Sequence, residues 1–262
     1  MLELCTLASG SSGNCLLVSC GQTHILVDAG ISCRRITTAL KELEVDPAGL
    51  SAVLITHEHT DHMAGLATLT KKLRVPVYAS RGTGLQLCYR IPFLEELIHP
   101  FQPGACFDVG GVEVGTFPTS HDAAQSCGYT LSAGGRKLAV ATDLGYVTPE
   151  VERAVRGARL AVVEANHDVE WLRSGPYPYF LKERILGERG HLSNEAGAAL
   201  AWTAVEGGAA TVVLAHLSHE NNTPERARQT AAALLEARGA AVGRDVCLEV
   251  APRSTPGRRY QV

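Results

Sequence analysis

The sequence predicts an α/β fold of four layers, an αββα sandwich in which two mixed sheets stack face to face and helices flank both of them. Three observations predict it: the chain opens with short strands, strands and helices then alternate, and the same order recurs in the second half. With 262 residues, 45% of them hydrophobic, the chain can bury a large core, and we expect a single domain over residues 1–262.

The first part of the chain predicts short strands separated by turn residues. Apolar residues gather in brief runs, and a stretch rich in Ser and Gly between Ser9 and Asn14 separates the first two. We expect strands at residues 2–7, 15–19, 24–27, 52–56 and 75–78. We expect helices at residues 32–43, 65–73 and 81–88.

The second part repeats this order. Strands are expected near residues 112–117, 128–132, 137–141, 160–163 and 211–215. The turn Ala133-Gly134-Gly135-Arg136 joins two of them. Thr148 and Thr223 each precede a Pro and a Glu, which is typical of a helix start, and a further helix is expected after Ser193. Because each half has strands followed by helices, the two halves could be a very diverged internal duplication.

Composition describes a globular protein and excludes several classes. No apolar run approaches the about 20 residues of a membrane helix, and the N-terminus lacks the basic flank of a signal peptide, so we expect a cytoplasmic protein with no membrane contact. The eight cysteines are scattered without a Cys-x-x-Cys pair, which fits reduced, buried thiols. A net charge of −3 gives no support by itself for a nucleic-acid binder.

The segment His57-Glu58-His59-Thr60-Asp61-His62 predicts a metal site. Residues two apart point the same way in an extended chain but lie about 200° apart on a helix. His57 and His59 can therefore share one ion only beyond the end of a strand, and the strand at 52–56 ends directly before them. Asp61 and His62 point differently and can reach a second ion, so the spacing favours two metals over one. The alternative, a polar surface loop, is much less common for this pattern.

Three further residues follow other predicted strands. His121 comes after the strand at 112–117, Asp143 after the strand at 137–141, and His216 after the strand at 211–215. A lone histidine after a strand is more often an ordinary surface or core residue, but metal sites are built from loops at one edge of a rigid sheet. The shared position of these residues favours their being ligands.

This order of His-x-His-x-Asp-His, a distant His, Asp and final His resembles the metallo-β-lactamase superfamily over residues 9–219. The resemblance implies that His57, His59 and His121 hold one divalent ion, that Asp61, His62 and His216 hold a second, and that Asp143 bridges them. Such ligands suit Zn²⁺, and also Mn²⁺ or Fe.

Glu164 and the stretch Gly190-His191-Leu192-Ser193 indicate which class of ester the metal site hydrolyses. Ribonuclease Z-like phosphodiesterases have a similar Glu and Gly-His-Ser pair, and the resemblance implies that Glu164 orients His191 as a proton donor. A leaving 3′ oxygen benefits from such an acid. The alternative is that His191 only precedes a helix start and has no part in catalysis.

The phrases Ala8-Ser9-Gly10-Ser11-Ser12-Gly13-Asn14 and Ala215-His216-Leu217-Ser218-His219-Glu220-Asn221-Asn222, together with those around Glu164 and His191, are similar to the YycJ/WalJ group. The resemblance implies a 5′ to 3′ DNA exonuclease that releases nucleotides, acts on ends with a 5′ phosphate and serves mismatch repair. On this hypothesis Asp61 orients the attacking water and His191 protonates the 3′ oxygen. His219 stands where Lys or Arg is expected, which puts a phosphate contact there in doubt.

Other residues are candidates for contact with the substrate. Hydroxyl and amide groups of Ser9, Ser11, Ser12 and Asn14 could cradle a terminal phosphate, or could simply form a tight turn. The aromatic segment 171–180 could form a Pro-stiffened loop that stacks a base, or could cover a sheet edge. His167 is expected to line the site beside Glu164.

The sequence is also compatible with two other functions. A small-ester hydrolase, such as a thioesterase or cyclic phosphodiesterase, needs no basic groove, and the near-neutral charge favours it mildly. A non-catalytic metal-binding module could keep the fold, but such modules usually lose ligands and none is missing here.

Overall fold

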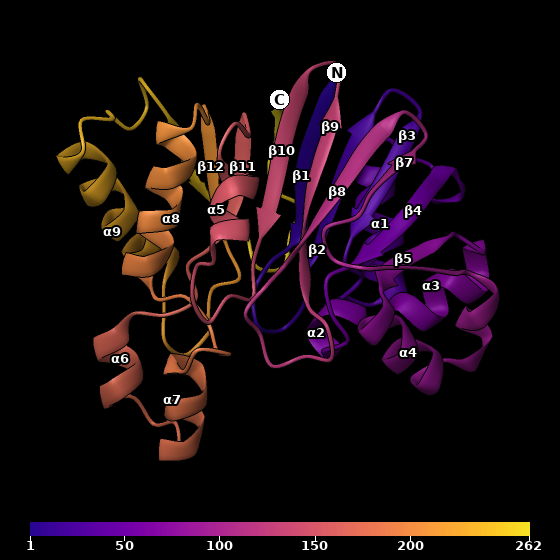
Figure 1. Ribbon diagram of the computed structural model, residues 1–262, viewed down its shortest axis with the longest axis horizontal. Helices are drawn as coiled ribbons and strands as arrows, with labels where there is room; N and C mark the ends of the chain where they lie inside the picture. The colour runs from indigo at the N-terminus through magenta and orange to yellow at the C-terminus, as the bar shows by residue number, and fades with distance from the viewer.

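Two seven-stranded mixed sheets form the centre of the molecule, which is described over residues 1–262 by a computed structural model (Figure 1). In order across the first sheet, the strands are β14 (Arg259–Gln261), β1 (Leu2–Ala8), β2 (Cys15–Cys20), β3 (Thr23–Val27), β4 (Leu50–Ile55), β5 (Val77–Ser80) and β6 (Ile98–Phe101). In order across the second sheet, they are β13 (Cys247–Val250), β12 (Thr211–Ala215), β11 (Leu160–Glu164), β10 (Arg136–Ala141), β9 (Cys127–Ala133), β8 (Val112–Pro118) and β7 (Cys106–Val109). Each sheet is mixed. In the first, β1 and β2 pair antiparallel and β3 and β4 pair parallel; in the second, β9 and β10 pair antiparallel and β11 and β12 pair parallel.

Helices cover the outer faces of both sheets, as Figure 1 shows. The first sheet is covered by α1 (Cys33–Glu42), α3 (Leu66–Leu73) and α4 (Arg81–Arg90). The second is covered by α5 (Pro149–Val155), α8 (Asn194–Glu206) and α9 (Pro224–Ala237). Two 3₁₀ turns (Pro47–Gly49 and Pro92–Glu96) and the short helices α2 (Thr60–Met63), α6 (Val169–Ser174) and α7 (Tyr179–Leu186) complete the chain. The predicted αββα sandwich is confirmed.

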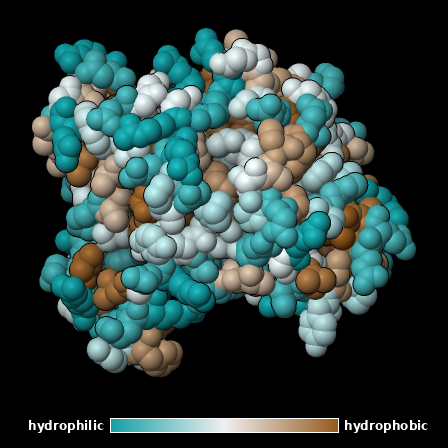
Figure 2. Space-filling view, in the orientation of Figure 1, coloured by the Kyte–Doolittle hydropathy of each residue, from teal (hydrophilic) through white to brown (hydrophobic).

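Alternation along the strands produces this layering. In β4, Val53 and Ile55 pack against helices, whereas Leu54 packs between the sheets. In β11, Val162 lies between the sheets and Val163 faces the helices. Successive side chains of a strand point to opposite faces, so a strand that is apolar throughout must be covered on both sides. The face shown in Figure 2 is largely hydrophilic, with hydrophobic side chains in small separate patches. No helix is long and apolar enough to span a membrane.

Most of the predicted elements are present, with small shifts at their ends. Thr148, Ser193 and Thr223 each accept a hydrogen bond from the first turn of the helix that follows, as N-cap residues do. The strand expected at 75–78 is β5, which begins two residues later. Residues 171–180, considered either as a base-stacking loop or as a cover over a sheet edge, are not one continuous loop. Helices α6 and α7 occupy most of the segment, and only Gly175 to Pro178 separate them.

The parallel strands determine where the site lies. β3, β4 and β5 run parallel in one sheet, and β10, β11 and β12 run parallel in the other. Because parallel strands end at the same edge, the loops after β3, β4, β10, β11 and β12 are brought together there. Figure 1 shows α2, α6 and α7 at this end of the sandwich.

Candidate metal centre

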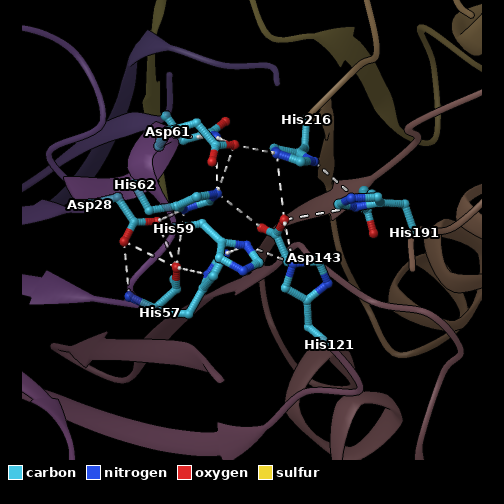
Figure 3. A network of polar contacts seen from close by, with 12 residues as sticks. Asp28, His57, His59, Asp61, His62, His121, Asp143, His191 and His216 are labelled. Carbon is cyan, nitrogen blue, oxygen red and sulfur yellow. Dashed lines mark hydrogen bonds and ion pairs between the residues drawn. The ribbon is translucent and has the colours of Figure 1, made fainter. Parts of the chain in front are cut away.

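Seven side chains that the sequence singled out as ligands converge at this edge (Figure 3). They come from the segment after β4 and from the loops after β8, β10 and β12. They are His57, His59, Asp61, His62, His121, Asp143 and His216. All but His59 and Asp61 are buried.

Three histidines form one donor group. Nε2 of His57 lies 3.0 Å from Nδ1 of His59, which lies 3.3 Å from Nε2 of His121. A tetrahedral zinc ion with Zn–N distances of about 2.0–2.1 Å separates its ligand nitrogens by about 3.3 Å. The three nitrogens are therefore spaced as ligands of one cation are.

A second donor group lies beside the first. Oδ2 of Asp61 is 3.4 Å from Nε2 of His62 and 3.4 Å from Nε2 of His216. Asp143 lies between the groups: its Oδ2 is 3.5 Å from Nε2 of His62, and its Oδ1 is 3.8 Å from Nε2 of His121. Oδ2 of Asp143 is buried and has no hydrogen-bond partner. A bound cation would satisfy this carboxylate oxygen, so the site has the donors to hold metal.

The outer nitrogens of the rings are held by other groups. Nδ1 of His62 lies 2.7 Å from a carboxylate oxygen of Asp28, and Nδ1 of His121 lies 3.1 Å from the carbonyl oxygen of Gly190. Nδ1 of His57 lies 3.0 Å from the hydroxyl of Thr56. These contacts leave Nε2 of each ring free toward the centre, the arrangement that orients histidine ligands in metal sites.

Asp28 is the functional residue that sequence reasoning missed. It follows β3, is almost wholly buried, and also accepts hydrogen bonds from the backbone N–H and the hydroxyl of Thr56. In Figure 3 it lies next to His62, on the side away from the centre. Its position directly after a predicted strand, the same position as Asp143 and His216, was the available signal.

The protonation of the site reflects its high density of charge. Burial lowers the pKa of His57 well below its ordinary value, and the charge of His62 lowers it further. Burial disfavours a charged His216, but Asp143, Asp61 and Glu164 surround the ring and raise its pKa to about 10. Burial would raise the pKa of Asp143, yet the surrounding histidines hold it well below its ordinary range. Protons therefore take the place of cations when no metal is bound.

Backbone strain is concentrated at the same edge. Asp28, Asp143 and His216 have φ values of 63°, 60° and 58°, and they are three of the five non-glycine residues with positive φ. A non-glycine residue in this region costs about 1–3 kcal/mol, and such residues cluster at functional sites. Each of the three follows a strand end. The side chains of Asp143 and His216 lie among the metal donors, and that of Asp28 contacts His62.

Glu164 and His191 adjoin the donor groups. Nδ1 of His191 donates to Oε1 of Glu164 at 2.7 Å, and Nδ1 of His216 lies 3.0 Å from the same oxygen. Burial would raise the pKa of Glu164, but the charge and hydrogen bond of His191, with the bond to His216, lower it to about 2. The carboxylate is therefore ionised and fixes both rings, so Nε2 of His191 points away from Glu164.

The loop between β1 and β2 divides into two parts. Ser9 accepts a hydrogen bond from the backbone N–H of His216 at 2.8 Å, and the backbone N–H of Asn14 donates to the carbonyl oxygen of Asp61 at 2.8 Å. Ser9 and Asn14 are nearly buried, whereas Ser11 and Ser12 are exposed. Ser9 and Asn14 thus support the loops of the site, whereas Ser11 and Ser12 are exposed. A phosphate contact at any of the four stays a prediction.

His167 does not reach the surface of the site. Its side chain is 1% exposed, and neither ring nitrogen has a hydrogen-bond partner. Burial lowers its pKa to about 4. Its backbone pairs with that of Ser193, next to His191, and a contact of His167 with substrate stays a prediction.

Comparisons with known proteins agree with this geometry. The family described as beta-lactamase superfamily domain matches residues 23–217. Exodeoxyribonuclease YycJ of Bacillus anthracis is 40% identical over 245 residues, which cover 92% of this chain and 92% of that protein. Exodeoxyribonuclease WalJ of Streptococcus pneumoniae serotype 2 is 39% identical over 228 residues, which cover 86% of this chain and 84% of that protein.

A solved structure shows the same fold at low identity. The crystal structure of Zn²⁺-bound PqqB from Methylobacterium extorquens has a TM-score of 0.73 and 19% identity, and the match covers 99% of this chain and 100% of that one. The resemblance expected from the sequence is confirmed. The chain belongs to the metallo-β-lactamase superfamily and, within it, to the group that contains YycJ and WalJ.

Proposed function

We propose that this metal-dependent hydrolase is a phosphodiesterase that removes nucleotides from the 5′ end of DNA. The Glu164–His191 pair beside the donor groups is the main support for this activity. Hydrolysis of an activated ester or thioester expels a stable leaving group, whereas an alkoxide leaving from a sugar needs a proton. A histidine held by a buried carboxylate supplies that proton.

Two divalent ions, Zn²⁺ or Mn²⁺ with Fe as a further choice, would be held by the seven ligands. His57, His59 and His121 would bind one ion, Asp61, His62 and His216 the other, and Asp143 both. When bound, such a pair activates water and neutralises the charge that develops on the phosphate. The remaining chemistry belongs to side chains of the chain.

Asp61 and His191 would act on opposite sides of the phosphorus. A water oxygen forms a bond to phosphorus, oriented by the carboxylate of Asp61, and the proton that the water loses passes to solvent. The bond between phosphorus and the 3′ oxygen breaks, and Nε2 of His191 gives its proton to that oxygen. Glu164 stabilises the protonated ring before transfer and keeps it aimed at the substrate.

The relatives support DNA as the substrate. Both are named exodeoxyribonucleases, and the matches cover more than four fifths of each of them. The resemblance also favours a role in mismatch repair, which a higher mutation rate in cells that lack the protein would support.

The test compares three substrates under the same conditions. Purified protein with Mn²⁺ is incubated with 5′-phosphorylated duplex DNA, a small thioester and a cyclic nucleotide. The proposal expects mononucleotides from the DNA and little turnover of the other two. The net charge of −3 favours a small-ester hydrolase as the alternative, and turnover of the thioester or cyclic nucleotide with intact DNA would establish it instead.

A further inference from the structure

A pocket of about 170 Å³ opens beside His191 and is not used by the chemistry above. Ser11, Asn166 and Ser218 line one part of it, and α7 closes another with Leu181 and Ile185. His121 also lines it, so the pocket is continuous with the donor groups. It therefore extends from the metal centre on the side of the proposed proton donor, the side on which Figure 3 shows His191.

The pocket carries an uncompensated positive charge. Two of its lining residues are arginines, Arg184 and Arg189, and one is a carboxylate, Asp122. Arg184 is paired with Asp122, with Nε and a terminal guanidinium nitrogen both 2.6 Å from Oδ2. Arg189 is exposed and has no carboxylate partner. Its guanidinium is free to bind a phosphate through two parallel N–H donors.

The direction of the reaction assigns an occupant to this pocket, and this step rests on the proposed function. When a nucleotide is removed from a 5′ end, the bond between phosphorus and the 3′ oxygen of the terminal nucleotide breaks. That 3′ oxygen receives the proton of His191. The terminal sugar must therefore lie on the His191 side of the phosphorus, where the pocket is, and the rest of the strand on the other side.

We propose that this pocket receives the 5′-terminal nucleotide and that Arg189 binds its 5′ phosphate. The volume is below the about 300–1,000 Å³ of pockets that enclose a whole small ligand. A sugar and its phosphate fit within it, and the base is left at the mouth, where half-buried Tyr177 offers an aromatic face. A pocket limited to one nucleotide gives mononucleotide products, and Ser11 adds a hydroxyl to its lining.

The test uses Arg189→Ala with two DNA substrates that differ only at the 5′ end, one phosphorylated and one with a free hydroxyl. Wild-type protein is expected to degrade the phosphorylated end faster. Arg189→Ala should lower kcat/KM on that substrate about tenfold to hundredfold, the usual effect of losing a charged hydrogen bond, and leave the hydroxyl substrate unchanged. Arg189→Lys should retain part of the preference. Arg136→Ala is the control variant. It removes an arginine at the start of β10, the end of that strand away from Asp143, and should behave as wild type.

A binding measurement gives a readout that is independent of turnover. In the presence of EDTA, fluorescence anisotropy of a 3′-labelled single strand should show tighter binding of the phosphorylated end by wild type and equal binding of both ends by Arg189→Ala. Equal losses on both substrates, or no loss on either, would overturn the assignment of Arg189. If wild-type protein with Mn²⁺ degrades neither DNA, the proposed function itself is wrong.

Discussion

Glu164 connects the two chemical parts of the site. Its Oε1 meets Nδ1 of both His191 and His216, and its Oε2 accepts from the backbone N–H of Leu144 and Leu192. The side chain is fully buried. A buried carboxylate with this many donors is both ionised and immobile, so a single residue orients a proposed ligand and the proposed acid.

Removing the acid should slow only those reactions that need a proton. His191→Ala is expected to lower the rate on DNA by about 10²- to 10⁴-fold, the usual contribution of a general acid. The rate on bis(4-nitrophenyl) phosphate, whose leaving group is stable without a proton, should fall far less. Metal content, measured by mass spectrometry, should not change. An equal loss on both substrates would contradict the role of His191. His99→Ala, which removes a histidine of β6, is the control and should keep the wild-type rate on both substrates.

Removing the carboxylate between the donor groups should have a different signature. Asp143→Ala is expected to abolish metal binding and activity together, because Asp143 contacts histidines of both groups and carries the orphaned oxygen. Metal content per chain and nucleotide release are measured on the same preparation. A variant that keeps its metal and its rate would exclude Asp143 as a ligand.

At the level of elements, the loop after β3 must pack tightly against α2 for the site to form. A Cβ added to Gly30 would lie 1.7 Å from the carbonyl oxygen of Asp61, so this contact tolerates no side chain. Gly30→Ala should displace Asp61, reduce metal binding and destabilise the fold by about 1–3 kcal/mol.

Gly49→Ala is the matched control, because a Cβ there meets nothing within 4 Å. Thermal unfolding and metal content are compared for both variants. Wild-type behaviour of Gly30→Ala would show that the loop can move without cost.

The sequence predicted the layers and the seven side chains that converge at the sheet edge because both depend on local patterns. Apolar runs such as the one ending at Ile55 identify strands, and the candidate ligands follow strand ends. Asp28 was missed because a single Asp has no pattern of its own and its partner His62 is 34 positions away. The contribution of Ser9 to the His216 loop likewise spans 207 positions and appears only in three dimensions.

Short or interrupted elements were missed for a different reason. β14 has three residues and exists through its pairing with β1. β6 contains a Pro, which disfavours a strand except at a sheet edge, where it lies. In α6 and α7, helical residues are divided by Gly175 and two prolines, and such a segment resembles a loop in sequence.

For the whole molecule, the charged centre should make stability depend on metal and pH. In the metal-free protein the pKa of His216 is about 10, against an ordinary value of 6.5. A raised pKa means that the protonated ring stabilises the fold fully below about pH 6.5 and that this contribution is lost as pH rises toward 10. The melting temperature of metal-free protein should therefore fall over this range.

Metal-loaded protein should resist the same change, because cations replace the protons on the rings. Calorimetry of both forms between pH 6.5 and 10 measures the difference. A melting temperature of the metal-free form that stays constant or rises, or an equal fall in both forms, would contradict the proposed exchange of protons for metal.

If the proposed function is right, the protein needs two divalent ions at the donor groups to hydrolyse DNA from its 5′ end. Metal-free protein is titrated with Mn²⁺ while nucleoside 5′-monophosphates released from a 5′-phosphorylated duplex are measured. We expect no release without metal, and release that rises with Mn²⁺ and levels off at two ions per chain. Release in EDTA, saturation at one ion, or no release at any metal content would contradict it.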